Sequence, residues 1–305
     1  MKYWWVNQNQ TYKYEVPGGF LWSPKRNANG NRNPFYDNMT RLSAGDIVFS
    51  FAETLIRATG VVQGAAYESP KPDFKAAGSN WSNIGWFAEV EFVPIQKPIA
   101  PKNHMDLIGP LLNQVYAPLQ QSGKGNQGVY LTEVSRELGE LLIELSHISM
   151  DFIWSAAAPL SNLDDTETER MVESDESALE KVQLIKARRG QGLFKANVRL
   201  IERRCRVTGL ETPRHLIASH IKPWAASNDA EKLDGANGLL LSPHIDHLFD
   251  KGFISFGDRG NVIVSNELDP SVLNQWNLNL SANVGEFESR QCKYLEYHRD
   301  EVFID

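Results

Sequence analysis

Residues 216–252 read LIASHIKPWAASNDAEKLDGANGLLLSPHIDHLFDKG, and this stretch decides the fold of the C-terminal half. Its apolar residues predict a strand that ends near His220, and the leucine run at 239–241 predicts a second, short strand. Ser242 followed by proline is typical of a helix start, and Gly252 is typical of a helix end. The stretch therefore predicts two strands, joined by a long polar loop, and then a helix.

The segments on either side extend this prediction. Residues 205–209, CRVTG, predict a further strand that leads into a turn at Gly209. Residues 253–265, FISFGDRGNVIVS, alternate around a Gly-Asp-Arg-Gly turn, which predicts a plain hairpin. We therefore expect a small mixed unit in which every element is short.

The composition excludes several classes of protein. Hydrophobic residues make up 42% and charged residues 23% of the 305 residues, which excludes wholesale disorder, and the length indicates two domains. Cys205 and Cys292 are the only cysteines, so neither a disulfide framework nor a Cys-x-x-Cys zinc ribbon is possible. No apolar run approaches the roughly 18 residues of a membrane span, and the N-terminus lacks a signal peptide's apolar stretch. We expect a cytoplasmic protein without a membrane partner.

The net charge of −7 lies in one segment. Residues 151–177 contain one arginine and eight acidic residues, whereas basic and acidic residues balance within 1–150 and within 178–305. An acidic block between two neutral halves is typical of a solvated linker, so we expect domains at 1–150 and 178–305 joined by 151–177. The alternative is an autoinhibitory strip that mimics DNA.

A basic run follows the acidic block. Nine basic residues and one acid, Glu202, lie between Lys181 and Arg206. Such a density suits neutralisation of phosphates, which gives affinity without sequence information, although it also fits a solvated helix face. The residues expected to contact DNA phosphates are Arg188, Arg189, Lys195, Arg199 and Lys222.

Residues 180–305 resemble the HNH (ββα-metal) nucleases through several motifs in order: CRVTG, SHIKPW, NGLLLSP, DHLFDKG and YLEYHRDEVF. Phosphodiester hydrolysis needs a base for water and positive charge for the developing oxyanions. The resemblance implies that His220 is the general base, that Asn237 supports and orients it, and that Asp246 holds a divalent ion. Asn237 as a simple turn residue before Gly238 is the alternative.

The resemblance leaves the set of metal ligands open. Asp250 lies one helical turn after Asp246 and so faces the same side, where it is expected to complete the site or to act as a helix-end residue. Many HNH nucleases carry a metal-binding Asp or His immediately before the base, but this chain has Ser219 there. Its hydroxyl and backbone carbonyl oxygens are candidate ligands, and His244 and His247 are candidate substitutes. Carboxylate oxygens favour Mg²⁺ or Mn²⁺.

The N-terminal half is rich in aromatic residues that lie on strand-like stretches. The order KYWWV, FLWSP, LSAGDIVFSF, GVVQGAA and WFAEVEFVPI resembles an EVE domain of the PUA-like superfamily, which implies a small, curved β-barrel. EVE-like domains hold a modified base among aromatic side chains, and aromatic faces replace the stacking that an extruded base loses. The pocket candidates are Trp22 and Ser23 on one loop-like stretch and Trp81 and Asn83 on another. Packing of these tryptophans in the core is the alternative.

Together the halves predict an α+β protein with a PUA-like (EVE) barrel and a C-terminal HNH ββα-metal domain. The combination resembles modification-dependent (Type IV-like) restriction endonucleases, which cut DNA with 5-hydroxymethylcytosine or 5-methylcytosine as a defence against phage. The implied partner is double-stranded DNA with modified cytosine, and one HNH site per strand suggests a homodimer. Two alternatives are a non-catalytic reader with a degenerate HNH scaffold and an unconditional HNH nuclease.

Overall fold

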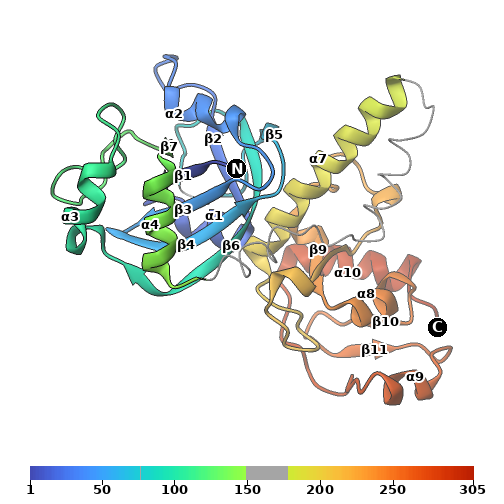
Figure 1. The fold of residues 1–305 in the computed structure, drawn as a ribbon. Helices are drawn as coiled ribbons and strands as arrows, with labels where there is room; N and C mark the ends of the chain where they lie inside the picture. The colour runs from blue at the N-terminus through green and yellow to red at the C-terminus, as the bar shows by residue number, and fades with distance from the viewer. Residues whose placement is uncertain (76, 149–177) are drawn as a thin grey trace. The chain divides into compact units, whose positions relative to one another are not determined.

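The computed structural model describes residues 1–75, 77–148 and 178–305, with side chains from residue 190 onward in the last range. The chain divides into two compact units, Met1–Asp175 and Glu176–Asp305. Figure 1 shows a unit built on a sheet and a second unit of helices and short hairpins, so the predicted α+β class is confirmed. The predicted acidic linker lies outside the described residues. Within the described part of the chain, no helix is both long and apolar enough to span a bilayer.

A seven-stranded sheet organises the N-terminal unit, in the order β2-β6-β4-β3-β1-β7 with β5 beside β6. Its strands are β1 (Tyr3–Asn7), β2 (Phe20–Pro24), β3 (Ile47–Ala52), β4 (Leu55–Val62), β5 (Tyr67–Pro70), β6 (Ile84–Ile99) and β7 (Leu131–Val134). All neighbours are antiparallel except β1 and β3.

Strand β6 curls this sheet. It is 16 residues long and pairs with β2 and β5 through its first part and with β4 through its second part. Among the described strands, no pairing joins β2 to β7 at the two ends of the order. The sheet is therefore a half-barrel, which agrees with the curved β-barrel that the sequence predicts.

Alternation along the strands creates a core on both faces of the sheet. Trp4 and Trp5 are adjacent in β1 and point to opposite faces, and each is fully buried in a different apolar cluster. Helix α4 (Arg136–Ser146) covers the Trp5 face, because Leu138 and Leu142 lie one turn apart on its apolar side. Ser135 caps this helix by accepting a hydrogen bond from the Leu138 N–H.

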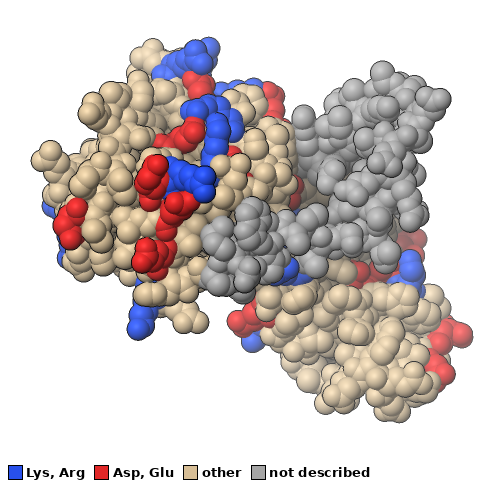
Figure 2. Space-filling model, viewed as in Figure 1, with Lys and Arg blue, Asp and Glu red and all other residues tan. Residues whose placement is uncertain are grey.

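The remaining helices of the N-terminal unit are short. They are α1 (Tyr12–Gly18), α2 (Pro34–Asp37), α3 (Met105–Ile108) and the 3₁₀ turns Asn38–Arg41, Pro101–Asn103 and Gly109–Leu111. Figure 2 shows acidic and basic side chains next to one another over the middle of the visible face of this unit, with further charged groups at its edges. The visible face of this unit therefore carries charges of both signs and not a patch of one sign.

The C-terminal unit contains the predicted ββα arrangement. Its elements are α7 (Ala178–Ile201), β8 (Ile217–His220), β9 (Gly238–Leu241), α8 (Pro243–Asp250), β10 (Ile254–Phe256), β11 (Val262–Val264), α9 (Pro270–Gln275), α10 (Ser289–Glu301) and the 3₁₀ turns Pro213–His215, Trp224–Ala226 and Gly235–Asn237. Strands β8 and β9 are antiparallel, and α8 follows directly; β10 and β11 form the predicted second hairpin.

The predicted strand at residues 205–209 is absent, since the structure has turns there. The Gly209 N–H donates to the Cys205 carbonyl, and Gly209 adopts a φ of 73°, a conformation that glycine accepts without strain. The Arg206 guanidinium binds the Glu202 carboxylate through two nitrogens and the carbonyls of Gly285 and Glu286 through the third.

Helix α7 packs directly on the β8–β9 hairpin. A Cβ atom at Gly238 would lie 2.3 Å from Val198 and 2.7 Å from Phe194, so only glycine permits this approach. Gly238 has a φ of −146°, which is ordinary extended backbone. The Asn-Gly pair is therefore not a tight turn, and its glycine is needed for space between α7 and β9.

Candidate active site and base-reading pocket

His220 lies at the end of β8, opposite Gly238 of β9. Its imidazole stacks on the Phe194 ring, with centroids 3.5 Å apart and planes 8° apart, and meets the edge of Trp224 at 5.5 Å. Burial between these rings lowers the pKa of His220 to about 4, although the Lys232 carbonyl partly opposes this shift. The imidazole is therefore neutral at physiological pH, as a general base requires.

One backbone carbonyl fixes the tautomer of His220. Its Nε2 lies 3.2 Å from the Lys232 carbonyl oxygen, which can only accept a hydrogen bond. We infer that Nε2 carries the hydrogen and that Nδ1 keeps its lone pair. The ring is thus held by a stacked phenyl group and by one hydrogen bond, with its basic nitrogen on the other side.

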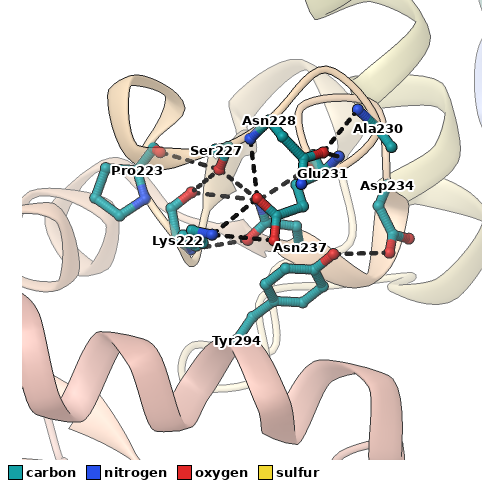
Figure 3. A network of polar contacts seen from close by, with 9 residues as sticks. All are labelled: Lys222, Pro223, Ser227, Asn228, Ala230, Glu231, Asp234, Asn237 and Tyr294. Atoms are coloured by element: carbon teal, nitrogen blue, oxygen red, sulfur yellow. Dashed lines mark hydrogen bonds and ion pairs between the residues drawn. The ribbon is translucent and has the colours of Figure 1, made fainter.

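Asn237 is fully buried and acts on the loop between the two strands. Its Oδ1 accepts from the Lys222 N–H at 2.8 Å, and its Nδ2 donates to the carbonyls of Lys222 at 3.2 Å and Glu231 at 3.1 Å and to the Ser227 hydroxyl at 3.3 Å. Figure 3 shows these bonds converging on one amide. The amide therefore fixes the loop at Glu231, and the carbonyl of the following residue, Lys232, binds His220. Asn237 thus orients His220 through this loop and not by direct contact.

The predicted metal ligands lie on β8 and α8. Ser219 is buried in β8, Asp246 is half-buried on α8, and His247 and Asp250 are exposed on α8. Asp250 pairs with Lys251 at 2.8 Å, and His247 meets the edge of Trp276 at 6.1 Å. Within the described residues, no three His, Cys, Asp or Glu side chains gather as a metal site. The four ligands remain predictions.

The predicted phosphate contacts have different environments. Arg188 and Arg189 lie outside the described side chains, and Lys195 is half-buried on α7. Lys222 pairs with both oxygens of the Glu231 carboxylate, at 3.0 and 2.8 Å. Arg199 is only 6% exposed, and its guanidinium donates to the Pro213 carbonyl at 3.4 Å. The side chain of Arg199 thus packs largely inside the unit, and its contact with a phosphate stays a prediction.

A pocket of about 780 Å³ opens on the N-terminal unit. Trp81 forms part of its wall, but Trp22, Ser23 and Asn83 do not line it. The lining residues are Asn9, Gln10, Tyr12, Lys13, Ala52, Glu53, Ala77, Gly78, Ser79, Asn80 and Trp81. The lining is mainly polar, and Tyr12 and Trp81 are its aromatic side chains.

The Trp22 ring lies directly behind Trp81. Trp22 is 1% exposed, stacks on Trp81 with centroids 6.1 Å apart, and meets Phe74 edge-on at 5.9 Å. Among the described residues, the Trp22 indole Nε1 and the Ser23 hydroxyl are buried without a hydrogen-bond partner. Asn83 is exposed and so lies apart from this group. Trp22 faces Trp81, whereas the side chain of Ser23, the next residue of β2, points to the opposite face of the sheet.

A buried carboxyl group holds the backbone of Trp22. Glu15 is fully buried, and its Oε1 accepts from the Trp22 N–H at 2.8 Å and from the Tyr130 hydroxyl at 2.6 Å. Its Oε2 accepts from Gln8 at 2.8 Å and from the Thr11 hydroxyl. Burial raises the pKa of Glu15, while these donors oppose the shift. Trp22 is therefore rigid, whereas Trp81 lies on the loop between β5 and β6.

Sequence reasoning missed several residues of both sites. Phe194 and Trp224 enclose the His220 ring from separate elements; Trp224 closes the SHIKPW motif, but the motif does not show that its ring meets His220. The polar run at residues 7–10 is different, because it follows directly on an aromatic strand and could have indicated a pocket rim.

Comparisons with known proteins fit the geometry of the C-terminal unit. A family model described as HNH endonuclease matches residues 205–257, which include β8, β9, α8 and β10, so this unit carries an HNH domain. The curated proteins contain no match. Similar solved structures include the human THYN1 protein in complex with 5-methylcytosine-containing DNA, at 13% identity and a TM-score of 0.31 over 49% of this chain and 99% of that chain. The Pho92 YTH domain in complex with m6A has 13% identity and a TM-score of 0.30 over 49% and 87%. A protein from Pseudomonas putida has 14% identity and a TM-score of 0.32 over 47% and 99%.

Proposed function

We propose that the protein is a modification-dependent endonuclease whose C-terminal unit hydrolyses DNA phosphodiesters and whose N-terminal unit reads a modified cytosine. The observation that carries the proposal is the state of His220 within the HNH domain. Its ring is neutral, its Nε2 is occupied by the Lys232 carbonyl, and its Nδ1 keeps a lone pair.

His220 would act as the general base. Its Nδ1 takes a proton from water, and the resulting hydroxide attacks phosphorus in line with the leaving oxygen. The imidazolium that forms is stabilised by its hydrogen bond from Nε2 to the Lys232 carbonyl. Phe194 and Trp224 keep the ring in one orientation throughout, which reduces the entropy that the reaction must lose.

Oxygen ligands of α8 and β8 suit a hard divalent ion. Mg²⁺ is commonly held by one or two carboxylates together with substrate phosphate, so Asp246 with an oxygen of Ser219 is a sufficient protein contribution. Asp250 or His247 would supply a further ligand. Such an ion stabilises negative charge on the scissile phosphate and on the leaving oxygen.

The base-reading site would combine the open pocket with the two tryptophans. A base that stacks between Trp22 and Trp81 needs about 7 Å between the rings, twice an ordinary contact distance. The rings are 6.1 Å apart, so Trp81 must move aside to admit the base. Each face of the base would then be covered by one of the two indole rings.

A nuclease unit that cuts without sequence preference, but only where the N-terminal unit has bound a modified base, needs both units on one DNA molecule. Because one HNH site cuts one strand, we infer that a double-strand break requires two copies of the chain, as a homodimer or as two molecules that meet on DNA. The modified cytosine, 5-hydroxymethylcytosine or 5-methylcytosine, follows from the resemblance to EVE–HNH enzymes.

A second candidate is a reader without catalysis. Ser219 in place of the usual ligand favours this alternative, as does the lack of a three-residue cluster of His, Cys, Asp or Glu in the part of the chain that the structure describes. Binding of modified DNA without metal-dependent cleavage would support it.

Replacement of His220 separates these functions. We expect His220→Ala to lower the cleavage rate of modified plasmid at least about 100-fold, the usual contribution of a general base, and to leave binding in gel shifts unchanged. His215→Ala is the matched control, because this exposed histidine belongs to the same unit. Undiminished cleavage by His220→Ala, or equal loss of cleavage and binding, would contradict the assignment.

A further inference from the structure

A second pocket lies within the C-terminal unit, between α10 and the loop that Asn237 fixes. Its volume is about 330 Å³, enough for a phosphate group with part of its sugar. The lining residues are Lys222, Glu231, Asp234, Arg290, Lys293, Tyr294 and Tyr297. Four of these residues lie beyond residues 205–257, so the family match does not cover this wall.

One face of α10 supplies that wall. Arg290, Lys293, Tyr294 and Tyr297 follow at intervals of three, one and three residues, which places them along one side of a helix. The Tyr294 hydroxyl donates to Asp234 at 3.0 Å, as Figure 3 shows. The helix thus presents two cations and two phenols to the loop.

The charges of the pocket do not balance. Arg290 pairs with Asp234 at 2.7 Å, and Lys222 pairs with Glu231 at 2.8 Å while its ammonium lies 5.2 Å from the Tyr297 ring centre. Lys293 is exposed and has no counter-ion among the described residues. Three cations therefore face two carboxylates, and one negative charge is needed to neutralise the pocket.

A phosphodiester supplies that single charge and accepts hydrogen bonds from ammonium, guanidinium and phenol groups. We propose that this pocket binds a backbone phosphate of the DNA strand, next to the scissile phosphate and separate from it. The proposal rests on the proposed nuclease function, and it names Lys293, Arg290 and Lys222 as the groups that hold the strand.

The position of the pocket in the chain links it to His220. Lys222 is two residues after His220, in the bend that directly follows β8. Glu231 precedes Lys232, whose carbonyl binds the His220 ring. A phosphate that docks between α10 and this loop therefore positions the strand relative to the base.

The salt dependence of DNA binding tests the proposal. For the full chain with EDTA present, each lost phosphate contact should reduce the slope of log K against log salt concentration by about 0.9. We expect this reduction and a raised Kd for Lys293→Gln, with an unchanged Tm because the side chain is exposed. Arg259→Gln, an exposed cation in the β10–β11 turn, is the matched control and should keep the wild-type slope.

Two results would overturn the proposal. One is a wild-type slope for Lys293→Gln and for Arg290→Gln; the other is a reduction by Arg259→Gln as large as that by Lys293→Gln. Titration with dCMP tests whether the pocket binds a free nucleotide instead of a DNA strand. Sub-millimolar binding of dCMP, together with a wild-type salt slope of DNA binding for Lys293→Gln, would also reject a strand contact. Because binding is measured without a metal, failure of this pocket and failure of cleavage are separate outcomes.

Discussion

Asn237→Ala should destabilise the C-terminal unit and remove the support of His220. The fully buried amide takes part in four hydrogen bonds, and the alanine variant would leave the Lys222 N–H without a partner. The carbonyls of Lys222 and Glu231 would each retain one other donor, from Ser227 and from Asp234. The loop would thus lose the side chain that joins its parts but keep its other hydrogen bonds.

The size of the effect follows from this inventory. An orphaned buried N–H destabilises by about 1–3 kcal/mol, and each of three bonds whose partners stay satisfied contributes roughly 0.5 kcal/mol. The sum is about 3 kcal/mol, which corresponds to a fall in Tm of roughly 10 °C for a unit of this size. Asn237→Asp should not rescue the protein, because its second oxygen would face carbonyl oxygens where the amide donated.

Thermal unfolding followed by circular dichroism measures this change. Asn266→Ala is the matched control, since this exposed asparagine belongs to the same unit and should leave the Tm unchanged. At a temperature where all variants are folded, Asn237→Ala should still cleave more slowly than wild type. A loss below about 1 kcal/mol, or full stability of Asn237→Asp, would refute the proposed role of the amide.

Three further predictions concern other parts of the molecule. Burial lowers the pKa of both His298 and His220 to about 4, so the unfolded chain takes up protons near pH 6.5 before the native state does. From pH 7 to pH 5 each histidine should lower the free energy of unfolding by about 2 kcal/mol, and His298→Gln should remove about half of the total fall in urea titrations. Gly238→Ala should destabilise by about 1–3 kcal/mol, because the new methyl group would meet Val198, whereas Gly64→Ala, with nothing within 4 Å, should be neutral in the same assay. Trp81→Ala should reduce the binding preference for modified over plain DNA by roughly 10-fold, and Trp276→Ala, an exposed tryptophan of the other unit, should not.

The ββα hairpin and helix could be predicted because their signals are local. Ser242 with its following proline and Gly252 mark the ends of α8 within one or two residues of the observed bounds. The strand predicted at residues 205–209 failed because Arg206 bonds to the carbonyls of Gly285 and Glu286, some 80 positions away. No local pattern shows such a partner.

The same distinction applies to the N-terminal sheet. Its strands were visible as aromatic runs, but closure depends on whether β2 and β7 meet, which the residues of neither strand reveal. Trp22 was placed in an open pocket because its neighbours resemble a loop; it is covered by Phe74 and Trp81, which reach it from another part of the chain.

In the candidate site, residue types predicted the base but not its protonation state. The identity of His220 as a base candidate came from its motif, whereas its neutral state depends on Phe194 and Trp224, whose rings meet it only after folding. Arg199 was counted with the basic run, but the helix turns it inward. Charge composition cannot distinguish an inward from an outward arginine.

Cleavage of four matched plasmids, carrying cytosine, 5-methylcytosine, 5-hydroxymethylcytosine or glucosylated cytosine, would show most directly whether reading and cutting are joined in one chain. With Mg²⁺ or Mn²⁺, the wild-type protein should cut at least one modified plasmid and spare the unmodified one, and EDTA should stop all cutting. Equal cutting of all four plasmids, or no cutting of any of them with either metal, would contradict a modification-dependent nuclease.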